Sequence, residues 1–401
     1  MLSAKVFTAN VILMSGRFEI NSKISEHMRL ARCRHLLTFA LVLIGFAGSS
    51  CSPVLREAGG ETSNPTLNPI EILEKSPRMY QIAFRSIADS IETALSSSYL
   101  AGSLDAASFP RPRVLAALKD SSRTEDLMAR EIAELEYVKA SRRFDAGAEQ
   151  AASYHLKRAM TADPSFRPPY IMLGDMLLER DAIERAFDLF SRVLTWDSTD
   201  SNALVGLATC AIKMGRIADA RKALVDAVIF DRVNLKAWSL LSLVVGTQGC
   251  STANHDVPEL GLVRKLRGRH YKIVIDASLE DCPVEATAWI AYASERAVWK
   301  YEDKYKTYFG VTKYAPTYEE DVDCYMVLAA AWKTLAQRDS AACDPEYLEY
   351  LSKVAEDGYL VSHVLFDHVC IKAPTAARQF SVEVIGKMRE YVNTYVIVPK
   401  G

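Results

Sequence analysis

An internal repeat with a period of 34 residues constrains the fold of this chain more than any other feature. Bulky side chains recur at that interval at Tyr170, Leu204 and Trp238, and small ones at Ala152, Ala186 and Ala220. A unit of this length cannot bury an apolar face alone, so neighbouring units must stack and share a core. We therefore predict a stack of helical units, in which the bulky side chains fill the gaps and the small ones let helices cross closely.

The register of the repeat resembles the tetratricopeptide repeat, a helix–turn–helix unit of the same length. The middle unit carries the family's residue types most fully, at Tyr170, Leu173, Gly174, Ala186 and Phe190. The resemblance implies units at 133–166, 167–200 and 201–234, followed by a helix from Leu235. Gly147 and Gly215 mark inter-helix turns, because glycine takes a left-handed backbone conformation without strain.

The predicted fold class is all-α, with a tetratricopeptide-type solenoid of about three repeats plus a further helix. N-terminal helices over 76–132 precede the repeat region at 133–250, and a mostly helical C-terminal domain over 251–401 follows it. Apolar residues at steps of three or four predict a helix over Met79–Leu95. Further helices are expected near 113–119 and 124–144, and residues 263–266 are expected to complete a fourth helical pair.

The sequence of the C-terminal region predicts four helices and one small two-stranded β pair. A helix capped at Asp281 runs to Tyr308, and a capping box at 317–320 opens a helix through Ala336. A third helix starts at Pro345, and a fourth covers 374–393. Residues 271–276 read as a short strand, and residues 395–398 are the expected partner strand.

Residues 28–50 have the pattern of a secretory signal peptide. Arg29, Arg32 and Arg34 precede an apolar run, and small residues follow it. Retention of the apolar run as a membrane anchor is the alternative. Residues 1–27 carry no comparable pattern, and we expect them to be an upstream extension without a fold of its own.

Cys51, directly after the small residues, resembles the cysteine of the bacterial lipoprotein lipobox, which is acylated and becomes the mature N-terminus. Gly48 departs from that motif, which usually has an aliphatic residue there, so cleavage without lipidation is the alternative. The resemblance implies an exported protein with a lipid-anchored tether over 51–75. Ser52 implies an outer-membrane lipoprotein that faces the periplasm or the cell surface, attached to the membrane only through its lipid.

In the tetratricopeptide family the first helix of each unit lines the concave face, and this geometry implies a set of groove residues. They are Tyr137, Val138, Ser141, Ile171, Met172, Asp175, Val205, Thr209, Lys213, Ser239, Leu240 and Leu243. A mostly apolar groove with a few polar points suits an extended or helical segment. The resemblance therefore implies an interaction or assembly adaptor for a protein or peptide partner in the cell envelope. The alternative is that the chain's own terminal helices fill the groove.

The sequence lacks familiar catalytic and metal-binding motifs, and we expect neither a metal site nor a cofactor. A net charge of −2 lacks the basic excess of a nucleic-acid-binding chain. The carboxylates at 319–323 lie in the first turns of a helix, where the helix dipole already favours them. The alternative to an adaptor is an enzyme whose site lies in the C-terminal domain and gathers Glu295, Arg296, Asp321 or His363 in one pocket.

The cysteines predict a small number of disulfides. The chain has eight cysteines, and export to an oxidising compartment permits disulfides among those at or after Cys250. The candidate pairs are Cys250 with Cys282, and Cys324 with Cys343 or Cys370. Cys210 lies in a repeat helix and is expected to be a packed free thiol.

Overall fold

The computed structural model describes residues 10–14, 17–21, 68–85, 122–337 and 345–400. The chain is mostly helical, as predicted, and forms two compact units. Met1–Ala106 with His255–Val364 form the first, the sheet unit, and Ala107–Asn254 with Leu365–Gly401 form the second, the repeat unit. The predicted single C-terminal domain over 251–401 is therefore wrong, because the last residues of the chain pack with the repeats.

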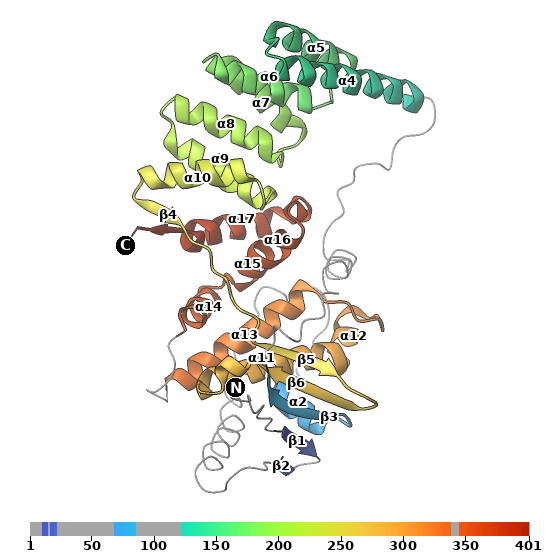
Figure 1. Cartoon of the computed structure of the whole chain (residues 1–401), viewed down its shortest axis with the longest axis vertical. Coiled ribbons are helices and arrows are strands. Elements are labelled where there is room, and N and C mark those ends of the chain that lie inside the picture. The colour runs from blue at the N-terminus through green and yellow to red at the C-terminus, as the bar shows by residue number, and fades with distance from the viewer. Residues whose placement is uncertain (1–9, 15–16, 22–67, 86–121, 338–344, 401) are drawn as a thin grey trace, which may run out of the picture. The chain divides into compact units, whose positions relative to one another are not determined.

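The helices of the repeat unit follow the predicted register and stack one after another (Figure 1). They are α4 (Ser122–Asp145), α5 (Glu149–Ala162), α6 (Pro168–Glu179), α7 (Ile183–Trp196), α8 (Ser201–Lys213), α9 (Ile217–Phe230) and α10 (Leu235–Thr247). Asp200 and Asn234 cap α8 and α10, since their side chains accept hydrogen bonds from the backbone of Ala203 and Ala237. The predicted helix pairs are thus confirmed, and α4 starts before the predicted unit boundary at 133.

The turn after each first helix has a residue with positive φ at the same place in every unit. These residues are Gly147, Asp181, Gly215 and Gly249, with φ of 72°, 58°, 73° and 74°. At Gly215 the turn is a Schellman motif, because Arg216 N donates to Ala211 O and Gly215 N donates to Ile212 O. Asp181 was not predicted as a left-handed position, although it lies one period from both Gly147 and Gly215.

Phe190 on α7 occupies the space between two glycines. A Cβ added to Gly174 on α6 would lie 2.6 Å from the Phe190 ring, and one added to Gly206 on α8 would lie 2.4 Å from it. The ring is fully buried and therefore packs against the backbones of its own unit and of the next unit. The predicted small position at Gly174 is confirmed, and Gly206 is a second one that the sequence analysis missed.

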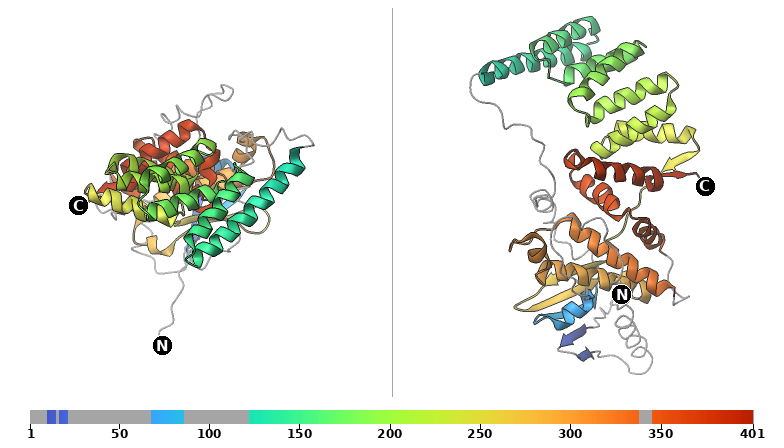
Figure 2. Two further views of the ribbon diagram at one scale, coloured as in Figure 1. Left: turned by 90° about the horizontal axis from the view of Figure 1, so that it is seen from above. Right: turned by 180° about the vertical axis from the view of Figure 1, so that it is seen from behind.

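Residues 365–400, the C-terminal cap, close the α10 end of the stack (Figure 2). The cap contains α16 (Cys370–Lys372), η5 (Ala376–Gln379), α17 (Val382–Tyr391) and most of the π-helix η4 (Val364–Val369), followed by η6 (Val392–Val396). Strand β7 (Ile397–Pro399) pairs antiparallel with β4 (Cys250–Thr252), which directly follows α10. Such a cap covers the apolar end that a stack of repeats otherwise exposes.

A buried arginine anchors the cap to the last repeat. The Arg232 guanidinium lies 4.6 Å from the Trp238 ring centroid and 4.4 Å from that of Phe366. Arg232 also forms an ion pair of 3.2 Å with Asp367. Because Phe366 and Asp367 belong to the cap, this one side chain joins both parts through cation–π and charge interactions.

The sheet unit combines a mixed sheet with a helical layer. Its elements are β1 (Asn10–Met14), β2 (Arg17–Asn21), α2 (Pro69–Lys75), β3 (Met79–Phe84), β5 (Gly261–Lys265), β6 (His270–Ile275), η3 (Ala277–Leu279), α11 (Pro283–Tyr301), α12 (Lys304–Phe309), α13 (Tyr318–Ala336), α14 (Glu346–Glu356) and α15 (Leu360–His363). The strand order is β2-β1-β3-β6-β5, and only β3 and β6 run parallel. Helix α11 packs on β5, where a Cβ at Gly261 would lie 2.8 Å from the Trp289 carbonyl oxygen.

The capping box at 317–320 is confirmed, because the Thr317 side chain accepts a hydrogen bond from Glu320 N at the start of α13. Helix α14 confirms the helix predicted from Pro345, and α17 covers half of the helix predicted over 374–393. Helix α11 ends at Tyr301 instead of Tyr308, since Asp303 takes a left-handed backbone conformation with φ of 61°.

The helix predicted over 79–95 is wrong at its start, where β3 lies. Met79–Phe84 pairs with β6 from Met79 opposite His270 to Phe84 opposite Ile275. Tyr80 and Phe84 share a face in a helix and also in a strand, so a short apolar run is ambiguous between the two. Residues 79–84 form a strand because the backbone of β6 offers them hydrogen-bond partners. Residues 86–95 and 113–119 lie outside the described residues.

The predicted β pair is also corrected. The strand at 271–276 is confirmed as β6, but it pairs with β3 and β5, whereas the expected partner at 395–398 overlaps β7 and pairs with β4. Residues 261–265 form β5 rather than part of a fourth helical pair. Strands pair with the strands that lie next to them in the folded chain. A periodic pattern along the sequence does not predict which strands these are.

Two segments predicted without structure contain regular elements. Helix α2 lies inside the tether predicted over 51–75 and is capped by Asn68. Strands β1 and β2 form a hairpin inside the extension predicted at 1–27, and β1 pairs with β3. Backbone pairing at a sheet edge needs no side-chain periodicity, which is why the pattern did not show it.

The candidate disulfides are wrong for the described cysteines. Cys250, Cys324 and Cys370 are free thiols, as is Cys210, which was predicted to be free. Cys282 is disulfide-bonded. Cys343 and Cys51 lie outside the described residues.

The turn geometry generates a matched pair of substitutions. We expect Gly215→Ala to lower the free energy of unfolding by roughly 1–2 kcal/mol, because a Cβ disfavours the left-handed conformation while no atom lies within 4 Å of it. The control Gly386→Ala, inside α17 and equally free of neighbours, should raise stability by about 0.5–1 kcal/mol through helix propensity. Chemical denaturation of both variants measures the difference, and an equal effect of the two substitutions would contradict the assigned turn.

Candidate functional site

The first helices of the repeat unit present a row of side chains at one repeat position. The row consists of Ser141, Asp175, Thr209 and Leu243, on α4, α6, α8 and α10. The Asp175 side chain is 43% exposed and Leu243 is 60% exposed, and the other two are partly exposed. All four were predicted groove residues, and the structure leaves each of them accessible. We call this set the groove row.

An ion pair crosses the groove row. Lys236 at the start of α10 lies 3.6 Å from Asp175 on α6, and α8 lies between these two helices in the stack. Burial raises the pKa of Asp175, while the charge of Lys236 opposes that rise. Lys213 forms a second ion pair of 2.8 Å with Asp181 at the adjacent turn. The sequence analysis did not predict Lys236 as a groove residue. The repeat register could have indicated it, because Lys236 is the second residue of the unit that starts at Leu235.

The other predicted groove residues differ in how far they are buried. Val205 is 1% exposed and belongs to the core. Met172 packs against the core cluster around Ala152 and Leu156, and the Tyr137 ring lies 5.7 Å from that of Phe166. The inclusion of Val205 in the groove is corrected because its side chain is buried, whereas Met172 and Tyr137 stay partly exposed. Val138, Ile171, Lys213, Ser239 and Leu240 keep partial or full exposure.

The C-terminal cap makes its contacts away from the groove row. Its side-chain partners on the last repeat are Arg221, Asp226, Arg232 and Trp238, on α9, at the start of α10 and between them. Among the described residues, no hydrogen bond, ion pair or ring contact joins the cap to Asp175, Thr209 or Leu243. The described part of the cap therefore does not support filling of the groove by the chain's own C-terminal helices.

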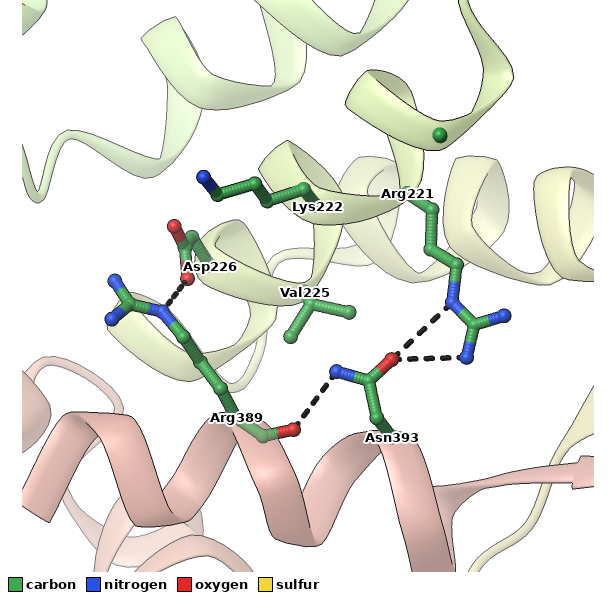
Figure 3. Close-up of a pocket in the computed structure, with 7 residues that line it drawn as sticks. Arg221, Lys222, Val225, Asp226, Arg389 and Asn393 are labelled. Carbon is green, nitrogen blue, oxygen red and sulfur yellow. Dashed lines mark hydrogen bonds and ion pairs between the residues drawn. The ribbon is translucent and has the colours of Figure 1, made fainter.

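A pocket of 240 Å³ lies between α9 and α17 (Figure 3). It is lined by Ala218, Arg221, Lys222, Val225, Asp226, Arg389 and Asn393. Arg389 pairs with Asp226, and Arg221 donates to Asn393 Oδ1 at 2.9 Å. Because most of these polar groups satisfy one another across the contact between α9 and the cap, we assign the pocket to the cap interface.

A buried charge network joins α11 and α13 in the sheet unit. Arg296 Nη1 donates to Asp321 at 2.6 Å and to Glu320 at 3.1 Å, and Tyr314 donates to the second Glu320 oxygen at 2.7 Å. Next to it, Lys304 pairs with Glu295 and, at 2.7 Å, with Asp323. Charges removed from water need such partners, so this pattern is typical of a structural network.

The residues of the predicted enzymatic alternative are only partly brought together. Arg296 and Asp321 meet in the network, Glu295 pairs with Lys304 instead, and His363 Nδ1 lies 3.1 Å from the Tyr350 hydroxyl. Among the residues that the structure describes, no group of three or more potential ligands could hold a metal ion. The network therefore offers paired charges in a core and no converging catalytic set in the described residues.

Glu320 in this network generates a pH prediction. Burial, opposed by Arg296, raises the pKa of Glu320 to about 7 in the folded chain, above an unfolded value of 4.5. Stability from the protonated group is therefore complete below pH 4.5 and is lost as the pH rises through 7. We expect the wild type to lose about 2–3 kcal/mol of unfolding free energy relative to Glu320→Gln between pH 5 and pH 8.

Denaturant unfolding at both pH values measures this difference. Glu179→Gln, at an exposed carboxyl on α6, controls for the substitution itself. A wild type and a Glu320→Gln variant with parallel pH profiles would contradict the raised pKa.

Comparison with known proteins identifies the class of the repeats. The tetratricopeptide repeat family profile matches residues 177–244, which include α7 to α9 and most of α10. Residues 177–244 are therefore similar to tetratricopeptide repeats, in agreement with the helix register. No protein of curated function matches the sequence.

Several solved structures are similar to parts of the chain. The tetratricopeptide domain of OM64 from Arabidopsis is 14% identical and covers 30% of this chain and 98% of its own, with a TM-score of 0.28. The MamA protein is 14% identical, with coverages of 57% and 96% and a TM-score of 0.27. A tetratricopeptide repeat protein from Parabacteroides merdae is 14% identical, with coverages of 66% and 100% and a TM-score of 0.27. Similarity at this level says nothing about the function of this chain.

Proposed function

We propose that the repeat unit is an adaptor that binds a protein partner along the groove row. The observation that carries the proposal is the accessible line of Ser141, Asp175, Thr209 and Leu243, one residue from each first helix. A stack of helices holds these side chains at a regular spacing, and the contacts of the C-terminal cap described above do not involve Asp175, Thr209 or Leu243. Tetratricopeptide repeats in general bind protein segments through side chains on such a surface.

The groove chemistry favours a partner segment with both an apolar and a charged side chain. Leu243 offers apolar area, and Asp175 and Lys236 offer opposite charges. Their ion pair is long and partly exposed, so its contribution to folding is small. A partner that brings its own charge can therefore exchange with one member of the pair at little cost and gain specificity from the other.

Site-specific photocrosslinking in intact cells tests the groove. We expect a photoreactive amino acid at position 243 to give one discrete protein adduct, and one at position 382, an exposed apolar site on α17, to give none of that size. Asp175→Lys should reduce the adduct yield roughly tenfold or more, because it places a second positive charge beside Lys236. Asp188→Lys, on the exposed side of α7, is the matched control and should leave the yield unchanged.

Circular dichroism of both charge variants confirms that they fold. Adducts that form equally from positions 243 and 382, or that persist in Asp175→Lys, would refute the groove assignment.

We further propose that the chain is exported and anchored by a lipid at Cys51, in the outer membrane and facing the periplasm or the cell surface. The charge, apolar and small-residue order of 28–51 supports this address. The disulfide at Cys282 is consistent with an oxidising compartment. None of the described helices is long and apolar enough to cross a membrane, and residues 28–50 lie outside the described ones.

Cell fractionation tests the address. We expect the wild type in the membrane fraction and Cys51→Ser in the soluble envelope fraction, because loss of the acylation site removes the anchor. Cys33→Ser, a cysteine inside the proposed signal peptide, should behave as the wild type. Globomycin, which blocks lipoprotein processing, should cause the precursor to accumulate. A mature chain that retains residues 10–21, which form β1 and β2, would contradict cleavage before Cys51.

A further inference from the structure

The first helix of the stack carries an exposed apolar stripe. Ile132, Leu135 and Val138 lie at steps of three residues on α4 and are 49%, 55% and 44% exposed. Residues at this spacing share one side of a helix. Three large apolar side chains exposed together on a single helix are unusual in a monomeric surface and mark an interaction face.

In the later units the counterparts of Leu135 are buried, and the counterpart of Val138 in the next unit packs against the preceding unit. The counterparts of Leu135 are Pro169, Ala203 and Ala237, and all three are buried. Ala203 belongs to a core cluster with Val193, which lies on the second helix of the preceding unit. The counterpart of Val138 in the next unit is Met172, which packs on Ala152 and Leu156 of the preceding unit's second helix. The stripe on α4 is therefore a unit-to-unit packing face for which the described residues provide no preceding unit.

The two ends of the stack differ in how they are finished. The α10 end is covered by the C-terminal cap, through the Arg232 contacts and the β4–β7 pairing. A second copy therefore cannot extend the stack from that end in the way that one repeat follows another. The α4 end is the one whose packing face stays exposed. Two copies with a single open end each can join only open end to open end, which closes the assembly as a two-fold dimer.

The charges on α4 suit an antiparallel partner with the same sequence. Glu131 lies at the N-terminal end of the stripe, and two basic residues lie at its C-terminal end: Lys139, which also pairs with Glu136 at 2.8 Å, and Arg142. Glu131 and Arg142 are exposed and form no ion pair among the described residues. In an antiparallel pair centred on Leu135, Ile132 faces Val138 of the second copy. Glu131 then lies within one turn of Lys139 and Arg142 of that copy, so opposite charges flank the apolar centre on both sides.

We infer that the stripe of Ile132, Leu135 and Val138 is a homodimer interface, in which α4 of two copies pack antiparallel around a two-fold axis at Leu135. The inference does not rest on partner binding at the groove row, although Val138 was also a predicted groove residue and Ser141 of the groove row follows it by three residues on α4. Dimerisation would present two grooves on one assembly, so a bivalent partner would bind more tightly than a monovalent one.

Light scattering on the purified full-length mature chain tests the dimer. We expect the wild type to have twice the mass of one chain, and Leu135→Glu to weaken dimerisation roughly 100-fold or more, since two negative charges would meet at the axis. Leu243→Glu, which changes the same residue type at a similarly exposed site on α10, should leave the mass unchanged. Far-ultraviolet circular dichroism of both variants checks that they fold.

Charge reversal tests the antiparallel register. Glu131→Lys should weaken the dimer, and adding Arg142→Glu should restore it, because the pairing then recurs with the signs exchanged. In a Cys250→Ser background, Leu135→Cys should form an intermolecular disulfide under mild oxidation, whereas Leu243→Cys should not.

A wild type that stays monomeric at roughly 50 µM would overturn the inference, since a functional dimer of this size needs micromolar affinity or better. A dimer that Leu135→Glu does not weaken would overturn it as well. The alternative is that residues upstream of α4 in the same chain cover the stripe. In that case the wild type would stay monomeric.

Discussion

The repeat unit depends on one close packing contact, the Phe190 ring held between the backbones of Gly174 and Gly206. Because neither position leaves room for a Cβ, the ring sets the distance between α6, α7 and α8 at once. The recurring turns at Gly147, Asp181 and Gly215 then set the direction of each second helix. A fixed distance and a fixed direction place every first helix in the same orientation, and the groove row is the line that results.

Both ends of this stack matter for what the chain can do. At one end, Arg232 lies against the rings of Trp238 and Phe366, and a segment from the end of the chain completes the core. At the other end, α4 has the residues of a packing face and no described unit in front of it. An adaptor of this form would carry a groove for one kind of partner and an end face for a second copy of itself, and these two surfaces would adjoin on α4.

Much of the repeat unit could be predicted, since periodic burial leaves its period in the residues. The helix pairs, the turns at Gly147 and Gly215 and the row from Ser141 to Leu243 all followed from one interval. The errors have physical causes. Val205 looks like a groove residue from its place on α8, yet its side chain is buried in the core. The strand at Met79–Phe84 satisfied a helical spacing equally well, and Lys236 paired with a residue two repeat units away.

The sequence by itself determined the repeat, its register and the conformation of its turns, because these depend on contacts between residues within one or two periods of each other. Only the tertiary structure decided which distant segments meet. It placed residues 365–400 on the last repeat, paired β3 with β6, and buried Arg296 beside Glu320 and Asp321. Such contacts depend on which backbone edges and charges still lack a partner after the local elements have formed. A local sequence pattern does not predict which groups these are.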